Sequence, residues 1–285
     1  MASDVDDELD PRLILAALGM ARVDAVERAE GGSDSAIWRV EVASAVYALR
    51  VFRPGEQEDR NRERVAMSAA SVARLPVPRL HAAGSWRERP ALLLDWLPGL
   101  TVYEALRQRP EQAAQLGALF GEAQARLHTV AAPAALAARP DGWIAWLGPD
   151  EPALAERLRA SAYPSGALLH LDYHPLNVLT DGERITGILD WRNVAAGPPR
   201  ADAARTHAIL RVDGPHIVAP RVRAILETFA NGWQTGYLQN GGSLDDMAPF
   251  YAWAGATMLR DLASKRSPDG LARIRVWTDG WLARL

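Results

Sequence analysis

One short run of polar residues constrains this chain more than any other feature: His170-Leu171-Asp172-Tyr173-His174-Pro175-Leu176-Asn177. Asp172 stands in a predicted loop, Asn177 follows five residues later, and Asp190 ends an apolar stretch. All three side chains carry oxygen atoms, which are the ligands that hard cations prefer. The fold must therefore present a polar loop and the end of a strand close to each other.

The spacing of these residues indicates a phosphoryl-transfer centre. In protein kinases, an aspartate of the catalytic loop accepts the proton of the acceptor hydroxyl, while a loop asparagine and a later aspartate hold magnesium. Here Asp172 has the spacing of the catalytic base, Asn177 that of the first metal ligand and Asp190 that of the second. We therefore predict that Asp172 is catalytic and that Asn177 and Asp190 bind Mg²⁺.

The pattern H-x-D-x-H-P-x-N-V-L, followed by I-x-D-W, resembles the aminoglycoside phosphotransferase and choline-kinase-like family of the protein-kinase-like superfamily. The resemblance implies an α+β, bilobal protein-kinase-like fold, with a small antiparallel sheet in the N-terminal lobe and a larger, mostly helical C-terminal lobe. It also implies a small-molecule kinase that transfers the γ-phosphoryl group of ATP or GTP to a hydroxyl of an antibiotic or metabolite. The resemblance extends over about residues 31–202 and includes Leu127-His128 and Asp202, which resembles an aspartate that braces the catalytic loop.

Two other interpretations of the run remain open. His170, Asp172 and His174 alternate along an extended segment and could bind zinc on one face, as in a metal hydrolase. That interpretation does not explain why Asn177 and Asp190 are present. The chain could also be a non-catalytic nucleotide-binding module, a pseudokinase, and an unusual arginine at position 50 is the only support for this.

Composition argues against several other classes. With 48% hydrophobic residues among 285, the chain suits one large domain or two modest lobes. The net charge of −3 gives no reason to bind nucleic acid or an anionic membrane, and the absence of cysteine excludes a disulfide or a thiol nucleophile. Because no apolar run reaches membrane-spanning length and residues 1–10 lack a signal segment, we expect a cytoplasmic protein.

Periodicity divides the chain into two parts. A short helix capped by Asp10 is expected first, then strands at 23–30, 36–42, 45–52, 79–84 and 91–96, with a helix at 56–74. After Leu97-Pro98-Gly99, helices are expected at 101–108, at 111–130 and from 202 to the end, and short strands at 167–169, 178–179 and 185–189. We place a nucleotide-binding lobe at residues 1–98 and a catalytic, substrate-binding lobe at residues 99–285.

A glycine-rich turn lies between the first two strands of the predicted sheet. Backbone N–H groups of Gly31, Gly32, Ser33 and Ser35 could approach phosphate oxygens there, although a plain hairpin turn has the same composition. The segment resembles the Gly/Ser loop of the family, in which asparagine often stands at the position of Asp34. Since a carboxylate would repel phosphate, we expect Asp34 to cap the turn.

The lysine that kinases use on the third strand is missing. Of the 32 lysine and arginine residues only Lys265 is a lysine, and it lies far downstream. The register of the third strand puts Arg50 at that position, where its guanidinium could grip two phosphate oxygens. We predict Glu63 as its partner, with Glu58 or Glu56 as alternates, although a solvated helix charge would look the same.

The strand that leads into the inter-lobe connection resembles the family's nucleotide hinge. The base of the nucleotide would bond to backbone groups there, and Asp95, Trp96 and Leu97 are the candidates.

The acceptor is not fixed by any motif. From residue 201 to the end, ten bases outnumber eight acids, so a polycationic acceptor is not expected and a neutral or weakly charged one is. Asp245 and Asp246 could bind an amine, but we expect them to cap a helix that starts near Leu244. Of the seven tryptophans from Trp143 onward, we expect most to pack between helices and one or two to line the cleft.

Overall fold

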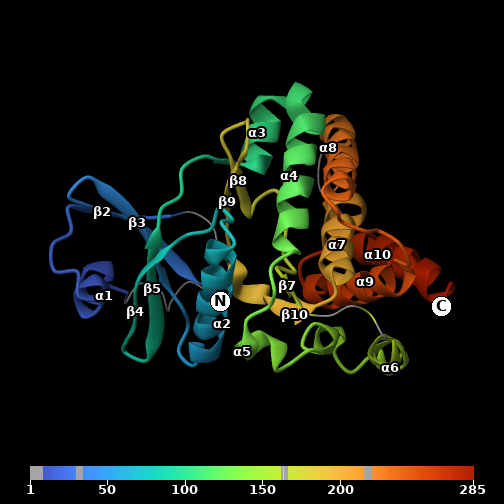
Figure 1. The fold of residues 1–285 in the computed structure, drawn as a ribbon, viewed down its shortest axis with the longest axis horizontal. Helices are drawn as coiled ribbons and strands as arrows, with labels where there is room; N and C mark the ends of the chain where they lie inside the picture. The colour runs from blue at the N-terminus through green and yellow to red at the C-terminus, as the bar shows by residue number, and fades with distance from the viewer. Residues whose placement is uncertain (1–8, 30–34, 162, 164–165, 215–219) are drawn as a thin grey trace.

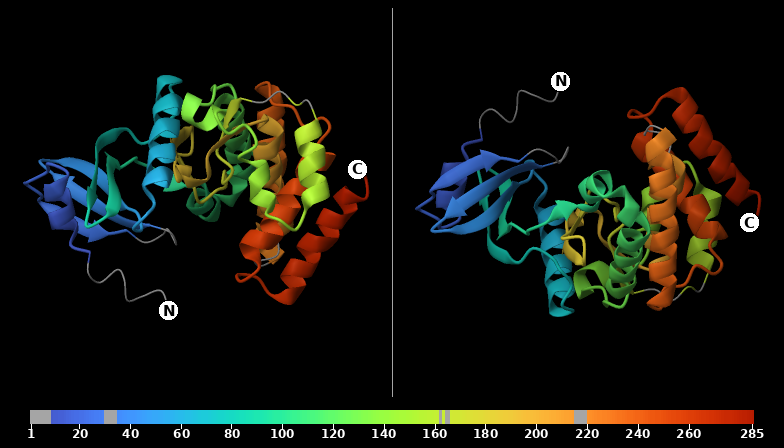
Figure 2. Two further views of the ribbon diagram at one scale, coloured as in Figure 1. Left: turned by 90° about the horizontal axis from the view of Figure 1, so that it is seen from below. Right: turned by 90° about the horizontal axis from the view of Figure 1, so that it is seen from above.

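The chain forms two regions, a sheet at the N-terminal end and a helical body that carries the C-terminus (Figure 1). The computed structural model describes residues 9–29, 35–161, 163, 166–214 and 220–285. Views from below and above show α2 (Gln57–Val72) between the sheet and the helical body (Figure 2). The C-terminus lies at the end of the molecule away from the sheet.

The N-terminal sheet is antiparallel and has five strands in the order β1-β2-β3-β5-β4. Their bounds are Ala25–Arg28 for β1, Ala36–Val42 for β2, Ala45–Val51 for β3, Leu80–Trp86 for β4 and Arg89–Asp95 for β5. In β2, Trp38 and Val40 are buried between less buried neighbours, which is the alternation of a sheet with one covered face. A helix, α1 (Pro11–Ala17), packs against β4, and Asp10 caps it by accepting from the backbone N–H of Arg12, as predicted.

The central strands place Arg50 beside the middle of the sheet. In the register of β3, Arg50 pairs with Ile37 of β2 and with Leu92 of β5. An interior strand is held on both sides, so the direction of its side chains is well determined.

The remaining chain is mostly helical. Its main helices are α3 (Val102–Gln108), α4 (Ala113–Leu127), α7 (Pro199–Ala208), α8 (Pro220–Gln239), α9 (Ala248–Leu262) and α10 (Pro268–Leu282). The shorter helices α5 (Ala134–Ala137) and α6 (Pro152–Ala160) lie between α4 and β7. A π-helical turn, Ile209–Asp213, continues α7.

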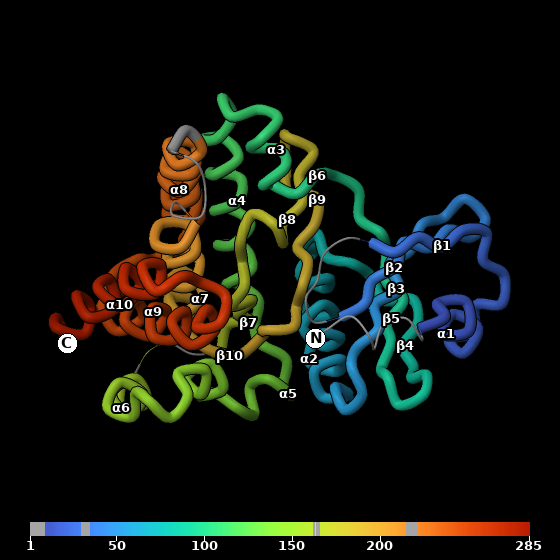
Figure 3. Tube along the Cα trace, turned by 180° about the vertical axis from the view of Figure 1, so that it is seen from behind, coloured from blue at the N-terminus to red at the C-terminus, as the bar shows by residue number. Residues whose placement is uncertain are grey.

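Two small sheets frame the polar run. Strands β6 (Leu100–Thr101), β8 (Val178–Thr180) and β9 (Ile185–Ile188) form one sheet, which lies beside α3 (Figure 3). Strands β7 (Ala167–Leu169) and β10 (Ala195–Gly197) form the other. The run from His170 to Asn177 therefore connects the two sheets.

Glycines let α4 and α8 approach closely. A Cβ atom on Gly121 would lie 2.1 Å from the carbonyl oxygen of Trp233, and one on Gly236 would lie 2.1 Å from that of Ala118. No side chain fits at such distances, so these glycines fix the spacing of the two helices. The pair supplies Phe120 and Phe229 to the buried core beneath the polar run.

The α+β kinase-like fold predicted from the sequence is confirmed. Some elements differ from the prediction: α9 begins at Ala248, not near Leu244, and the short strands β6 and β10 were not predicted. The division of the chain at residues 98 and 99 stays a prediction. Among the described residues, no helix is both long and apolar enough to cross a membrane.

Candidate active site

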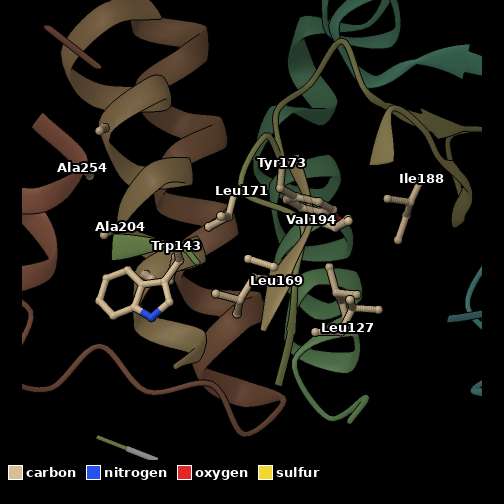
Figure 4. Close-up of a cluster of buried hydrophobic side chains, with 14 of the residues drawn as sticks. Leu127, Trp143, Leu169, Leu171, Tyr173, Ile188, Val194, Ala204 and Ala254 are labelled. Carbon is tan, nitrogen blue, oxygen red and sulfur yellow. The ribbon is translucent and has the colours of Figure 1, made fainter. Parts of the chain in front are cut away.

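The loop from His170 to Asn177 follows β7, and its alternate residues face opposite sides. Leu171 and Tyr173 are completely buried and belong to the apolar cluster drawn in Figure 4. The Tyr173 hydroxyl donates to the carbonyl oxygen of Phe120 at 2.9 Å. Asp172 lies between them and lines a cavity. The packing of its neighbours therefore fixes the direction of the Asp172 carboxylate.

Asp202, on α7, holds the backbone of this loop. Its Oδ1 accepts from the N–H of Leu171 at 2.7 Å, and its Oδ2 accepts from the N–H of His170 at 3.1 Å. Leu171 has φ of 62°, a left-handed conformation that costs a residue with a Cβ atom free energy. Burial would raise the pKa of Asp202, but hydrogen bonds from His128 and from the loop keep that pKa below its usual value. Asp202 thus braces the loop, as expected from the sequence.

Changing Asp202 to asparagine tests this brace. The side-chain N–H₂ group would face backbone donors, so we expect Asp202→Asn to lower the free energy of unfolding by about 2–4 kcal/mol. Urea denaturation measures the change, and Asp245→Asn, which alters an exposed aspartate, is the control. Equal stability of Asp202→Asn and the wild type would contradict the brace.

The two histidines of the run, His170 and His174, form hydrogen bonds within the site. His170 Nε2 lies 2.8 Å from the carbonyl oxygen of Leu189, so Nε2 carries the proton and Nδ1 accepts from the N–H of Asp172 at 3.3 Å. Burial lowers the pKa of His174, whose Nδ1 accepts from the N–H of Leu176 at 3.3 Å. In the described part of the chain, no group of three or more His, Asp or Glu side chains is arranged to hold a metal ion. Both ring nitrogens of His170 are engaged within the protein, which counts against the zinc hydrolase interpretation.

The structure brings Asp172, Asn177 and Asp190 together. The Nδ2 group of Asn177 donates to the backbone carbonyl oxygen of Asp172 at 3.1 Å and to its Oδ2 at 3.3 Å. The N–H of Leu189 donates to the carbonyl oxygen of Asn177 at 2.8 Å, which ties the end of β9 to the loop. Because Nδ2 is committed to Asp172, the amide oxygen of Asn177 is the atom that can coordinate a cation.

Asp190 takes a left-handed conformation, with φ of 58°, directly after β9. Its side chain is 39% exposed, and its Oδ1 lies 2.9 Å from Nη2 of Arg50. Burial would raise the pKa of Asp190, but the charge of Arg50 keeps the pKa below its usual value. Asp190 is therefore a carboxylate at neutral pH, and with the amide oxygen of Asn177 it gives an oxygen donor set that fits Mg²⁺.

Arg50 and Glu63 form a buried ion pair next to Asp190. Nη1 of Arg50 lies 3.0 Å from Oε2 of Glu63. Burial would lower the pKa of Arg50, but the carboxylates of Glu63 and Asp190 raise it above its usual value. Of the alternates, Glu58 pairs with Arg139 and Glu56 with Arg192. The predicted choice of Glu63 as the partner of Arg50 is thus the one found.

A second contact between α2 and the segment after Asp190 was not expected from the sequence. Nη2 of Arg192 lies 2.8 Å from Oε1 of Glu56 and 3.6 Å from Oδ2 of Asp59. Arg62, also on α2, makes a further contact: its Nη2 donates to the carbonyl oxygen of Arg192 at 3.2 Å. These contacts join residues 130 or more positions apart, which no local pattern reveals.

A cavity of about 460 Å³ lies between the sheet and the small sheet of β6, β8 and β9. The residues that line it include several predicted nucleotide-binding residues and both predicted metal ligands: Ser35, Arg50, Glu63, Asp95, Trp96, Leu97, Asn177 and Asp190. Gly31, Gly32, Ser33 and Asp34 lie outside the described residues. The side chain of Asp95 is engaged by the backbone N–H of Arg79 at 3.2 Å.

A second cavity, of about 600 Å³, opens on the other side of the loop. It is lined by Asp172 and His174 at one end and by α9 and the residues after it at the other. Asp190 and Leu176 line both cavities. The two cavities therefore meet at Asp190, with Asp172 lining the larger cavity and Asn177 lining the smaller one.

The model of the phosphotransferase enzyme family, designated APH, matches residues 25–240. This chain belongs to that family. It is therefore a phosphotransferase, and its acceptor group is a hydroxyl. No curated protein sequence matches closely enough to count as a relative.

Solved structures of other phosphotransferases and of a kinase have a similar fold. Aminoglycoside phosphotransferase APH(4)-Ia has a TM-score of 0.66 at 15% identity, over 95% of this chain and 97% of that chain. Macrolide 2'-phosphotransferase MphH from Brachybacterium faecium has a TM-score of 0.52 at 23% identity, over 94% of this chain and 95% of that chain. An ethanolamine kinase of Plasmodium vivax has a TM-score of 0.58 at 14% identity, over 91% of this chain and 83% of that chain.

The acceptor side of this phosphotransferase differs in part from the sequence expectation. Asp245 and Asp246 are not among the described residues that line either cavity. They do not cap α9 either, because that helix begins at Ala248 and has no side-chain cap, while Asp245 bonds to Ser243 instead. The expected capping role is therefore wrong, since the turn at Asp246, with φ of 52°, delays the helix.

The tryptophans of the phosphotransferase mostly pack between helices, as predicted. Trp143, Trp233 and Trp253 are buried, and Trp277 and Trp281 pack around Tyr251. Trp146 lines the cavity beside Asp172, and Trp191 lines the cavity beside Arg50.

Proposed function

We propose that this phosphotransferase is a small-molecule kinase that transfers the γ-phosphoryl group of ATP or GTP to a hydroxyl of an antibiotic or metabolite. The observation that carries the proposal is that two cavities share Asp190, while Asp172 lines one of them and Asn177 lines the other. A nucleotide in one cavity and an alcohol in the other would face each other there. One relative, a variant of APH(4)-Ia with a TM-score of 0.67 at 18% identity, was crystallised with AMP-PNP and hygromycin B.

Asp172 is the proposed catalytic base. Its carboxylate would orient the acceptor hydroxyl and take its proton. The Nδ2 group of Asn177 and the buried neighbours on both sides hold this carboxylate in place before substrate arrives. Such positioning supplies much of the rate of phosphoryl transfer.

Asp190 and the amide oxygen of Asn177 would hold Mg²⁺, which neutralises the charge of the phosphates when it is bound. Asp190 lies next to Arg50, so the cation and the guanidinium would share the negative charge of the phosphates. Glu63 keeps Arg50 directed toward this point. The site therefore offers the positive charge of Arg50 to phosphate and the negative charge of Asp190 to Mg²⁺.

The base of the nucleotide would lie at the Asp95–Leu97 connection. The N–H of Asp95 donates to the carbonyl oxygen of Arg79, and that of Trp96 donates to the carbonyl oxygen of Val46. We therefore assign the N–H of Leu97 as the donor to the base. Gly31, Gly32, Ser33 and Ser35 remain the proposed phosphate loop.

Magnesium-dependent turnover tests the function and separates it from a pseudokinase. The purified protein is incubated with ATP or GTP, Mg²⁺ and a panel of hydroxylated antibiotics and metabolites, and the nucleoside diphosphate formed is measured. We expect acceptor-dependent turnover that chelation of Mg²⁺ removes. Nucleotide binding without turnover on any acceptor would favour the pseudokinase alternative.

Arg50 should be required as a cation. We expect Arg50→Lys to retain part of the activity, because the charge remains, and Arg50→Met to lose most of it, because the phosphates are then poorly placed. Steady-state kinetics with saturating acceptor measures both. Full activity of Arg50→Met would show that Arg50 does not bind the phosphates.

The pH dependence of stability tests the environment of Glu63. Burial raises the pKa of Glu63 to about 7 in the folded protein, from an ordinary value of 4.5. A raised pKa means that Glu63 favours the fold most when it is protonated, and that this contribution is lost as the pH rises through about 7. Glu63→Gln, which stays uncharged, should therefore gain melting temperature relative to wild type between about pH 5 and about pH 8.

The control for this comparison is Glu58→Gln, an exposed change on the same helix. Its melting temperature should follow that of wild type at each pH. A constant difference between Glu63→Gln and wild type over this range would contradict the raised pKa.

A further inference from the structure

The cavity of about 600 Å³ beside Asp172 is the proposed acceptor cavity. Many charged side chains line it, but most of its carboxylates are already paired with arginines of the protein. Four carboxylates line it, namely Asp172, Asp190, Asp213 and Asp261. Asp190 is paired with Arg50. Since Asp172 is reserved for the reacting hydroxyl under the proposed function, Asp213 and Asp261 are the two acids that could recognise the rest of the acceptor.

Asp213 is bound by Arg266 in a bidentate pair. Nε of Arg266 lies 2.7 Å from Oδ1, and Nη2 lies 2.7 Å from Oδ2. This parallel geometry is the strongest arrangement of a guanidinium and a carboxylate. The carboxylate is 12% exposed, so a ligand that competes for it must displace Arg266 from a largely desolvated contact.

Asp261 is held by two arginines. Nη2 of Arg205 lies 3.3 Å from Oδ2, and Nη2 of Arg260 lies 3.0 Å from Oδ1. Arg205 is only 6% exposed, and its Nε donates to the carbonyl oxygen of Leu171 in the catalytic loop at 3.3 Å. Its guanidinium also lies 5.8 Å from the ring of Trp146. Arg205 is thus fixed by the protein and is not available to leave Asp261.

The part of the cavity away from the reacting centre therefore carries an excess of positive charge. Around Asp213 and Asp261 lie four lining bases, Arg205, Arg260, Lys265 and Arg266. A ligand with several ammonium groups would meet repulsion there and would find no unpaired carboxylate among the described lining residues other than Asp172.

The remaining wall of the cavity is apolar. Trp146, Ile209, Leu210, Leu226, Met258 and Leu262 line it. Aromatic and aliphatic walls of this kind favour ligands with an apolar body. A volume of about 600 Å³ is large enough for a ring system or a ring with an alkyl chain.

We propose that the acceptor is an alcohol with an apolar body and no ammonium group. Polycations are excluded because Arg266 neutralises Asp213, and Arg205 and Arg260 neutralise Asp261. This proposal rests on the proposed function and names its substrate class. The bidentate Asp213–Arg266 pair and the shared Asp261 are the contacts that set this specificity.

Matched pairs of alcohols test the proposal. One pair is octyl β-D-glucopyranoside and its 2-amino-2-deoxy analogue, and the other is cyclohexylmethanol and 4-(aminomethyl)cyclohexylmethanol. Hygromycin B serves as the polycation. Binding to the protein with Mg²⁺ and AMP-PNP is measured by calorimetry, and transfer is measured with ATP or GTP.

For the wild type, we expect the uncharged member of at least one pair to bind about tenfold or more tightly than its aminated analogue. Arg266→Gln frees the Asp213 carboxylate, so it should reduce this preference by about tenfold, while Arg266→Lys should keep most of it. Arg184→Gln, which removes an exposed arginine paired with Asp181 outside the cavity, should leave the preference unchanged. The retained preference of Arg266→Lys separates a change of charge from a loss of folding.

Tighter binding of the aminated analogues, efficient phosphorylation of hygromycin B, or no binding by either uncharged alcohol would overturn the proposal. An unchanged preference in folded Arg266→Gln would overturn the role of Arg266. Failure of the protein to bind AMP-PNP with Mg²⁺ would instead count against the proposed kinase function. The two proposals therefore fail by different measurements.

Discussion

Asp172→Ala is expected to lower turnover by about 10²–10⁴-fold while nucleotide still binds, because general-base removal has effects of this size. The side chain of Asp172 lies on the acceptor side and contacts Asn177, not Arg50 or Glu63. Single-turnover kinetics on an identified acceptor measures the rate, and calorimetry measures nucleotide affinity. Both are needed, since a loss of binding would produce the same fall in turnover.

Two variants control the Asp172 experiment. Asp172→Asn keeps the shape of the side chain and removes its basicity, so it should be nearly as inactive as Asp172→Ala. Asp245→Asn makes the same chemical change at an exposed site outside both cavities and should leave the rate unchanged. Wild-type turnover in Asp172→Asn would show that another group accepts the proton.

Asp190→Asn is expected to lower nucleotide affinity by about 100-fold or more when Mg²⁺ is present, and much less when it is absent. The asparagine oxygen can still accept from Arg50, so the fold around Arg50 and Glu63 should remain intact. What is lost is the anionic ligand of the cation. Calorimetric titration of AMP-PNP with Mg²⁺ and with a chelator measures the difference.

Asn177→Ala should show a smaller loss in the same titration, because it removes a neutral oxygen ligand and not a charge. Equal affinity of Asp190→Asn and wild type in the presence of Mg²⁺ would rule out a metal-binding role for Asp190. Melting temperatures of both variants exclude unfolding as the cause.

The catalytic side of the site could be predicted because its residues are close in sequence. Asp172 and Asn177 are five residues apart, and the apolar residues on either side of Asp172 predict which way it faces. Arg50 followed from the strand register, and Glu63 followed from its place on the next helix. The structure pairs these two at 3.0 Å, as predicted.

The acceptor side could not be predicted in the same way. Asp213 meets Arg266 across 53 residues, and Arg205 meets Asp261 across 56. The sequence drew attention to Asp245 and Asp246 because they are adjacent, yet they do not line either cavity in the described chain. Adjacent charges are easy to notice, but pairs made by the packing of α7, α9 and the segment before α10 are not.

The sequence alone predicted the kinase-like fold through its resemblance to a known family. Strand and helix periods predicted the order of the elements, and local spacing predicted the residues of the phosphoryl-transfer motif. Tertiary structure alone decided which carboxylates of the acceptor cavity remain free. Arg266 and Arg205 neutralise their partners only because helices distant in sequence pack side by side. The charge that a cavity offers to a ligand depends on such pairings, and a count of acids and bases along the chain does not contain them.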